Sequence, residues 1–236
     1  MSNILVLTRR ELKSYFSSPV AYIVITLFLL LSGWFFSAAL FLANTADLRG
    51  LFSGVRLILL FFVPAISMRL LAEEKRSGTI EILSTMPLKN WQLVLGKFLP
   101  SFILIAVTIL LTLVHYFTLL LIGEPDFGAS FGGYLGTLFM AGVYLSIGLF
   151  TSSMTKNQIV AFITAFVIIF VLFLMDKVVI FVPSFMATFF EFLSTDYHYE
   201  NIARGVIDSR DVIYFLSVTF FFLFLTVKSL ETRKWK

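Results

Sequence analysis

The chain has 236 residues, of which 59% are hydrophobic and only 14% are charged, and its mean hydropathy is +0.96. Soluble domains contain about 45–50% apolar and about 25% charged residues, so this composition indicates a membrane protein. The same composition disfavours an intrinsically disordered chain. Because the sequence contains no cysteine, it also excludes a disulfide scaffold and a thiolate metal site.

Long uncharged runs predict six membrane spans, each near the roughly 20 apolar residues that a transmembrane helix needs. We place them at about 20–43, 51–70, 98–122, 132–152, 157–176 and 212–230. Their continuous apolarity lacks the alternation of a membrane β-barrel, so the predicted fold class is an all-α integral membrane protein. The first run follows basic residues as a signal peptide would, but it is longer than the roughly 7–15 residues of a signal core.

The charged residues divide between two sides of the predicted membrane. Thirteen of the eighteen Lys and Arg residues fall in the N-terminal segment, the loops after the second and fourth spans, and the C-terminal segment. The other five share the opposite side with nine of the fourteen acidic residues. The positive-inside rule therefore predicts that both termini are cytoplasmic. Anionic lipid headgroups explain the basic surplus, and no nucleic acid partner is expected.

The N-terminal segment, 1–19, predicts an amphipathic helix that lies in the cytoplasmic interface. At helical spacing Leu5, Leu12, Tyr15 and Phe16 share one face. Pro19 then breaks the helix. The charged residues of this interfacial helix are Arg9, Arg10, Glu11 and Lys13. The helix either anchors the end of the chain or contacts a partner.

The cytoplasmic loop 71–97 contains a short helix between two breaks. Gly78 interrupts the chain, Thr79 can cap the helix that follows, and Pro87 ends it. The apolar side of that helix would be exposed to water in an isolated chain, so we expect it to be covered by a partner or by other cytoplasmic loops of the same chain. This side consists of Ile80, Leu83 and one or both of Ile82 and Met86.

The outer loop 177–211 begins with five phenylalanines, which predict re-entrant or interfacial helices between the fifth and sixth spans. A polar segment follows. It holds Ser194, Asp196 and His198, the residue types of a catalytic triad, but no nucleophile motif accompanies them. We therefore predict no catalytic residue.

Two ionisable residues lie within predicted spans. Arg56 is about 9 Å of helix rise past Gly50, so we expect its side chain to reach the outer headgroups, toward Asp47; the alternative is a polar group at a subunit interface. His115 has no acidic residue in its span. We therefore expect a hydrogen bond between helices, with a proton relay as the weaker alternative.

Three motifs resemble those of the ABC-2 type permeases, the membrane halves of ATP-binding-cassette exporters. They are RRELKSYFSSP before the first span, EEKRSGTIEILSTMP between the second and third, and LGK at the start of the third. The resemblance covers essentially the whole chain as one permease domain, 1–236. The outer segment YHYENIARGVIDSRDVIYFLS is similar to the small permeases of gliding motility and of copper and nitrous-oxide-reductase maturation, and the short loops are closer to the gliding-motility type.

The resemblance implies an ABC-2, type V exporter-like architecture that docks a cytoplasmic ATPase through the helix at 79–86 and the interfacial helix. The implied coupling residues are Glu73, Glu74, Arg76, Gly78, Thr79, Ile80, Glu81, Ile82, Leu83, Met86 and Pro87. The outer-loop motif residues are His198, Glu200, Arg204, Gly205, Asp208, Arg210 and Asp211.

The resemblance also implies partners for this chain. They are a second copy or a homologous permease, giving twelve spans, and a membrane-anchored periplasmic auxiliary protein, all in the bacterial inner membrane. The chain contains no G-x-x-x-x-G-K-[ST] phosphate loop. We therefore expect no enzyme activity or bound cofactor of its own, with ATP and Mg²⁺ held by the partner ATPase.

The leading functional hypothesis is ATP-driven export or extraction of a substrate that the sequence does not specify. The alternative is a subunit without transport activity that relays the motion of the ATPase to a periplasmic partner. A second alternative is an ion-coupled secondary transporter, which the nearly charge-free spans and the absence of an internal repeat disfavour. Apolar spans favour a lipidic, peptide or mechanical cargo over a small hydrophilic ion.

Overall fold

The computed structural model describes residues 3–42, 47–79, 89–181 and 183–232. Within these ranges all regular secondary structure is helical, and six helical segments are long and apolar enough to cross a membrane. These segments are Pro19–Phe41, Arg49–Ser77, Asn90–Ile122, Phe127–Met154, Gln158–Phe181 and Ser209–Glu231. The all-α membrane fold and the six spans predicted from composition are therefore confirmed.

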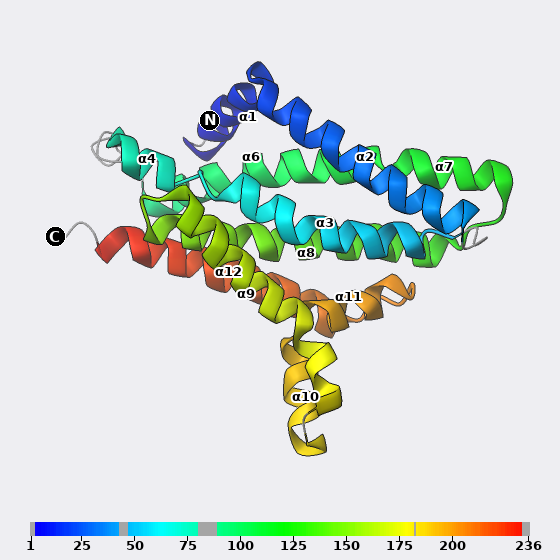
Figure 1. Ribbon diagram of the computed structural model, residues 1–236. Coiled ribbons are helices and arrows are strands. Elements are labelled where there is room, and N and C mark those ends of the chain that lie inside the picture. Colours follow the sequence, from blue (N-terminus) through cyan, green and yellow to red (C-terminus); the bar gives the residue numbers. More distant parts are fainter. Residues whose placement is uncertain (1–2, 43–46, 80–88, 182, 233–236) are drawn as a thin grey trace.

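The long helices run side by side along one direction (Figure 1). One end, which we call the terminal end, holds α1, α4 and both ends of the described chain; we call the opposite end the distal end. In chain order the elements are α1 (Asn3–Ser17), α2 (Pro19–Phe41), α3 (Arg49–Ser67), α4 (Ala72–Ser77), α6 (Asn90–Leu111), α7 (Leu113–Ile122), α8 (Phe127–Met154), α9 (Gln158–Val178), the 3₁₀ turn η1 (Val179–Phe181), α10 (Ser184–Leu193), α11 (Thr195–Ala203) and α12 (Ser209–Glu231).

The centre of the bundle is α8, which packs against α3, α6, α9, α11 and α12. It is the most buried of the spans, with 78% of its apolar window inside the molecule. Small residues recur along it and let neighbouring helices approach closely. At Gly132 a β-carbon would overlap the carbonyl oxygen of Ile202 on α11, so this close approach requires glycine.

The N-terminal helix α1 packs along α6, with Leu7, Thr8 and Tyr15 buried. Leu5 and Phe16, which were expected to share the apolar face with Tyr15, are exposed. The difference arises because the side of α1 that faces α6 is a row of residues spaced four apart, which begins at Leu7 and ends at Tyr15. The helix ends where Ser18 caps α2 by accepting a hydrogen bond from the Val20 amide at 3.1 Å.

The third span breaks at Thr112 into α6 and α7. His115 lies just after this break, where its Nδ1 is 3.0 Å from the Thr112 carbonyl oxygen and its ring packs against Phe36 of α2, with centroids 4.7 Å apart. Its hydrogen bond is therefore within its own helix, whereas its contact with another helix is aromatic. The expected hydrogen bond between helices is not present among the described residues.

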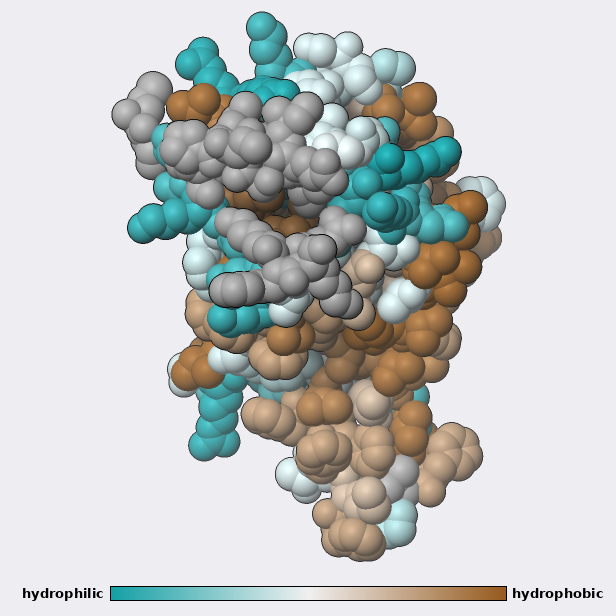
Figure 2. Space-filling view, turned by 90° about the vertical axis from the view of Figure 1, so that its left-hand side faces the viewer, coloured by the Kyte–Doolittle hydropathy of each residue, from teal (hydrophilic) through white to brown (hydrophobic). Residues whose placement is uncertain are grey.

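The loop between the fifth and sixth spans forms three short elements. η1 and α10 project sideways from the bundle (Figure 1), and Phe181, Phe185 and Phe189 are exposed. By contrast, α11 returns to pack against α8 and α9. The predicted aromatic helices are thus present as an apolar arm, visible below the bundle in Figure 2.

Candidate functional site

At the terminal end, three elements meet at the buried ammonium group of Lys97. This residue of α6 is 6% exposed. Its Nζ lies 3.0 Å from the Glu11 carboxylate of α1 and also forms an ion pair with Glu74 of α4. Nearby, the hydroxyl groups of Tyr15 and Ser101 are 2.9 Å apart, and burial raises the pKa of Tyr15. The N-terminal helix α1 and the start of the loop after the second span are therefore tied to the same span.

The start of that loop is also fixed to the end of α8. The hydroxyl oxygen of Ser152 accepts hydrogen bonds from the amides of Leu71 and Ala72, both at 3.0 Å, and donates to the Met68 carbonyl at 2.9 Å. The Lys75 ammonium group donates to the carbonyl oxygen of Ser153. A cation at this position complements the negative end of the helix dipole of α8. Movement of α4 is thus linked to the central helix.

Of the predicted coupling residues, Glu74 belongs to this cluster, and the other described ones lie within or just after α4. Glu73 and Arg76 are exposed, and Gly78 ends α4 with a φ of +73°, a left-handed conformation that glycine adopts readily. The Thr79 hydroxyl lies 2.9 Å from that of Ser77. The other predicted coupling residues, Ile80, Glu81, Ile82, Leu83, Met86 and Pro87, lie outside the described residues.

The charged residues of the interfacial helix separate into two groups. Arg9, Arg10 and Lys13 are exposed, whereas Glu11 turns inward to Lys97. Figure 2, which looks onto the terminal end, shows hydrophilic residues gathered over it. This end therefore offers a charged surface outside and a buried ion cluster beneath.

At the distal end, Arg56 of α3 forms an ion pair with Asp196 of α11 and lies 3.6 Å from Glu200. It does not pair with Asp47, whose carboxylate instead accepts the amide of Arg49 at 3.1 Å. The prediction that Arg56 reaches toward Asp47 was wrong, because α11 folds back under α8 and brings a buried carboxylate closer.

Asp196 is 2% exposed and has a second cationic neighbour, Lys177, at 3.2 Å. Burial raises the pKa of Asp196, while the charges of Arg56 and Lys177 act in the opposite direction. Arg56 also lies 4.7 Å from the centroid of the Tyr199 ring, within the range of a cation–π contact. These contacts join α3, α9 and α11.

A second buried pair joins α11 to α12. His198 Nδ1 lies 2.6 Å from the Asp211 carboxylate, and Nε2 lies 3.0 Å from the Phe192 carbonyl oxygen. The His198 ring stacks on Tyr214 at 3.9 Å. Ser194 caps α11 and does not bond to His198, so the three triad-like residues have separate structural roles.

The other outer-loop motif residues shape the chain around these pairs. Gly205 has a φ of +88° and packs against Gly128, which allows the tight return from α11 to α12. Asp208 caps α12 by accepting the Arg210 amide at 2.9 Å. The side chains of Arg204 and Arg210 are exposed. The motif therefore holds together α11 and the turn from α11 into α12, which we call the distal cap. Its spacing alone did not reveal this role.

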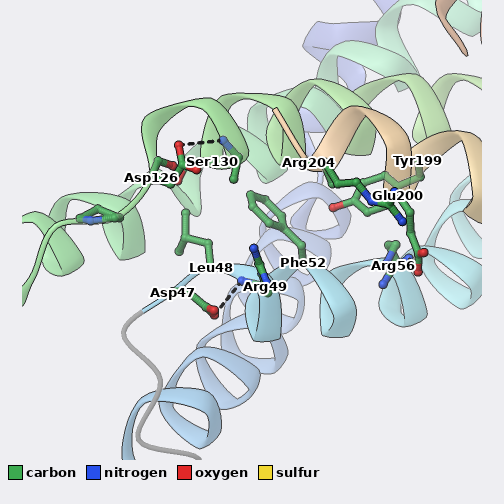
Figure 3. Close-up of a pocket in the computed structure, with 13 residues that line it drawn as sticks. Asp47, Leu48, Arg49, Phe52, Arg56, Asp126, Ser130, Tyr199, Glu200 and Arg204 are labelled. Atoms are coloured by element: carbon green, nitrogen blue, oxygen red, sulfur yellow. Dashed lines mark hydrogen bonds and ion pairs between the residues drawn. The ribbon is translucent and has the colours of Figure 1, made fainter. Parts of the chain in front are cut away.

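Between these elements lies a pocket of about 720 Å³, lined by residues of α3, α8 and α11 and of the segments before α3 and α8. In Figure 3, Tyr199, Glu200 and Arg204 lie on one side of it, Asp47, Leu48 and Arg49 on the other, and Phe52 between them. Burial raises the pKa of Tyr199 to about 12, so its hydroxyl remains protonated at neutral pH.

Comparison with protein families agrees with this architecture. The family of ABC-2 family transporter proteins matches residues 23–227. No curated protein matches the sequence. The match includes all six spans except the first turn of one and the last turn of another. It covers Lys97 and Glu74 of the ion cluster at the terminal end, but not Glu11 or Tyr15, and it covers all of α11. The chain therefore belongs to the ABC-2 transporter family.

Proposed function

We propose that this permease subunit exports or extracts a substrate across the bacterial inner membrane, driven by ATP hydrolysis on a separate cytoplasmic subunit that binds Mg²⁺ and ATP. Membership of the ABC-2 family supports a membrane component without its own ATP-binding domain. The outer-loop sequence is similar to permeases of both the gliding-motility and the copper and nitrous-oxide-reductase maturation types, and the short chain and loops support the gliding-motility type in this proposal.

The observation that carries this proposal is the ion cluster at Lys97. The docking elements proposed from the sequence are the interfacial helix and the helix at 79–86. Glu11 comes from the first of these, and Glu74 lies five residues before the second. One ammonium group holds the first element and α4, the helix that leads into the second, to α6. A push on this loop would therefore be transmitted to a membrane span.

The proposal is tested by co-purification. The chain, tagged and expressed in its native host, is expected to bring down an ATP-binding subunit. Charge reversal on the proposed docking surface, Glu73→Lys together with Glu81→Lys, is expected to reduce the amount recovered by about tenfold, because lost or repulsive ion contacts at an interface cost a few kcal/mol. The matched control, Lys156→Glu, changes an exposed charge just after α8. Equal recovery with all variants would contradict the docking assignment.

We also propose that two permease chains pair, giving twelve spans. Only 17% of the apolar windows of α2 and of the α9–η1 segment is buried within one chain, which leaves large apolar faces for a second copy, a homologous permease or lipid. A periplasmic auxiliary protein would cover the distal end. The mass of the purified complex, measured by light scattering, distinguishes one permease chain from two.

A further inference from the structure

The distal pocket contains polar groups that the protein itself does not satisfy. Among the described residues, neither the Arg56 Nε nor the Tyr199 hydroxyl has a hydrogen-bond partner, although both are buried. The Thr137 hydroxyl is near Tyr199 and donates its own proton to the Gly133 carbonyl at 2.7 Å. Tyr199 lines the pocket and is 2% exposed, and Figure 3 shows its hydroxyl directed toward Phe52. Buried donors without partners are uncommon in folded proteins.

The cations of the pocket are also incompletely paired. Arg56 is engaged by Asp196 and Glu200. The carboxylates of Asp47 and Asp126 accept hydrogen bonds from backbone amides at the starts of α3 and α8. Within the part of the chain that the structure describes, no acceptor contacts the guanidinium groups of Arg49 or Arg204, which also line the pocket. Among the described residues of the pocket, the buried polar atoms without a partner, Arg56 Nε and the Tyr199 hydroxyl, are thus both donors, and the guanidinium groups of Arg49 and Arg204 are two further donors without an acceptor.

An apolar groove begins next to this pocket. It has a volume of about 260 Å³ and lies between the α6–α7 segment and α8, lined by leucine and aromatic side chains. Ser130 of α8 lines both the groove and the pocket. Leu110, Phe127 and Phe131 on the groove are 46%, 69% and 51% exposed, so the groove opens to the surrounding bilayer.

From this arrangement we propose that the distal pocket binds the phosphate headgroup of a membrane phospholipid, with Arg49, Arg204 and Tyr199 as donors and one acyl chain in the groove beyond Ser130. The guanidinium fork matches the geometry of phosphate oxygens, and its hydrogen bonds to an anion are stronger than those between neutral groups. A phosphate also provides several acceptors for donors that otherwise lack one.

A soluble phosphate compound explains the pocket alone, because it has no part that would enter an apolar groove. An apolar ligand explains the groove alone, because it offers no acceptor to the two guanidinium groups or to the tyrosine hydroxyl. A phospholipid has both a phosphate and acyl chains, and the pocket and the groove that would hold them meet at one residue, Ser130. Phospholipid is also present in the membrane in which this chain lies. The site does not depend on the ATPase partner.

The test is equilibrium binding of fluorescently labelled phosphatidylglycerol to the full chain in dodecyl maltoside, without nucleotide. We expect saturable binding that unlabelled phosphatidylglycerol competes away, while equal concentrations of glycerol 3-phosphate and of diacylglycerol do not. The double variant Arg49→Gln/Arg204→Gln is expected to weaken binding by about tenfold or more, since hydrogen bonds to charged groups are the strong ones. Tyr199→Phe, which keeps the ring, is expected to weaken it several-fold.

The control is Arg210→Gln, which removes an exposed arginine at the same end that does not line the pocket. Unchanged affinity supports a specific site, and a loss equal to that of the double variant would mean general charge attraction and overturn the proposal. Competition by glycerol 3-phosphate would identify a site for soluble phosphate compounds, and competition by diacylglycerol a plain apolar groove; either overturns it. Thermal unfolding of each variant verifies that it is folded.

Discussion

The buried ammonium group of Lys97 neutralises two carboxylates that come from different elements, so its removal tests the coupling cluster at the scale of one residue. We expect Lys97→Met to lower the free energy of unfolding by about 2 kcal/mol, because it leaves Glu74 and Glu11 largely buried and unpaired. Adding Glu74→Gln is expected to restore part of this loss, since it removes one uncompensated charge. Lys156→Met, at an exposed position of the same end, is the control. The measurement is thermal unfolding in detergent, and equal stability of wild type and Lys97→Met would contradict a structural role for the cluster.

The ion pair between Arg56 and Asp196 is a second prediction at this scale. Arg56→Gln is expected to destabilise the distal cap by about 2 kcal/mol, because Asp196 is buried and, among the described residues, retains only the more exposed Lys177 as a cationic neighbour. Arg56→Lys keeps the charge and is expected to destabilise the distal cap less than Arg56→Gln does. Limited proteolysis between α10 and α12 reports the loosening of this region. A cap that resists protease equally in all three proteins would show that the pair contributes nothing.

At the scale of elements, the packing of α11 under α8 depends on a missing side chain. Gly132→Ala is expected to lower stability by about 1–3 kcal/mol, because a β-carbon there overlaps the backbone of Ile202. The matched variant on the same helix is Gly142→Ala, whose β-carbon would meet Phe102 and Thr219 at 3.6 and 3.8 Å, ordinary contact distances. It is expected to be neutral or slightly stabilising, since alanine favours helix. Thermal unfolding of both proteins compares the two positions, and equal effects would contradict the close contact.

The six spans were predictable from the sequence, whereas the contacts between distant residues were not. A bilayer requires each span to be a long apolar helix, so a local property of the sequence, the uncharged run, is enough to locate each span. By contrast, Arg56 and Asp196 are 140 residues apart, and no local pattern selected Asp196 over Asp47. Similarly, the prediction for α1 identified an amphipathic helix, but which row faces α6 depends on tertiary packing.

The outer-loop motif was recognised as distinctive, but its role became evident only from the structure. His198 and Asp211 are separated by 13 residues, and it is the turn at Gly205 that brings them together. The sequence signal that would have predicted this is glycine between two short polar segments, a pattern typical of a tight return. The residues that His198 and Asp211 contact were not predictable without the position of α11.

At the scale of the whole molecule, the orientation predicted from charge is testable because the chain has no cysteine of its own. Single cysteines at the exposed positions Lys13 and Arg210 mark the terminal and distal ends. With a membrane-impermeant maleimide on intact spheroplasts, we expect labelling of Arg210→Cys and no labelling of Lys13→Cys until the membrane is permeabilised. The reverse pattern would place the termini outside and contradict the positive-inside assignment.

The central claim is that this permease is driven by ATP hydrolysis on another chain, and ATPase activity of the complex purified through a tag on this chain tests it most directly. We predict that an ATP-binding subunit co-purifies, that the complex hydrolyses ATP, and that Glu73→Lys together with Glu81→Lys lowers both recovery and turnover. A chain that purifies alone, without ATPase activity, and that transports a substrate in proteoliposomes on an ion gradient would contradict it.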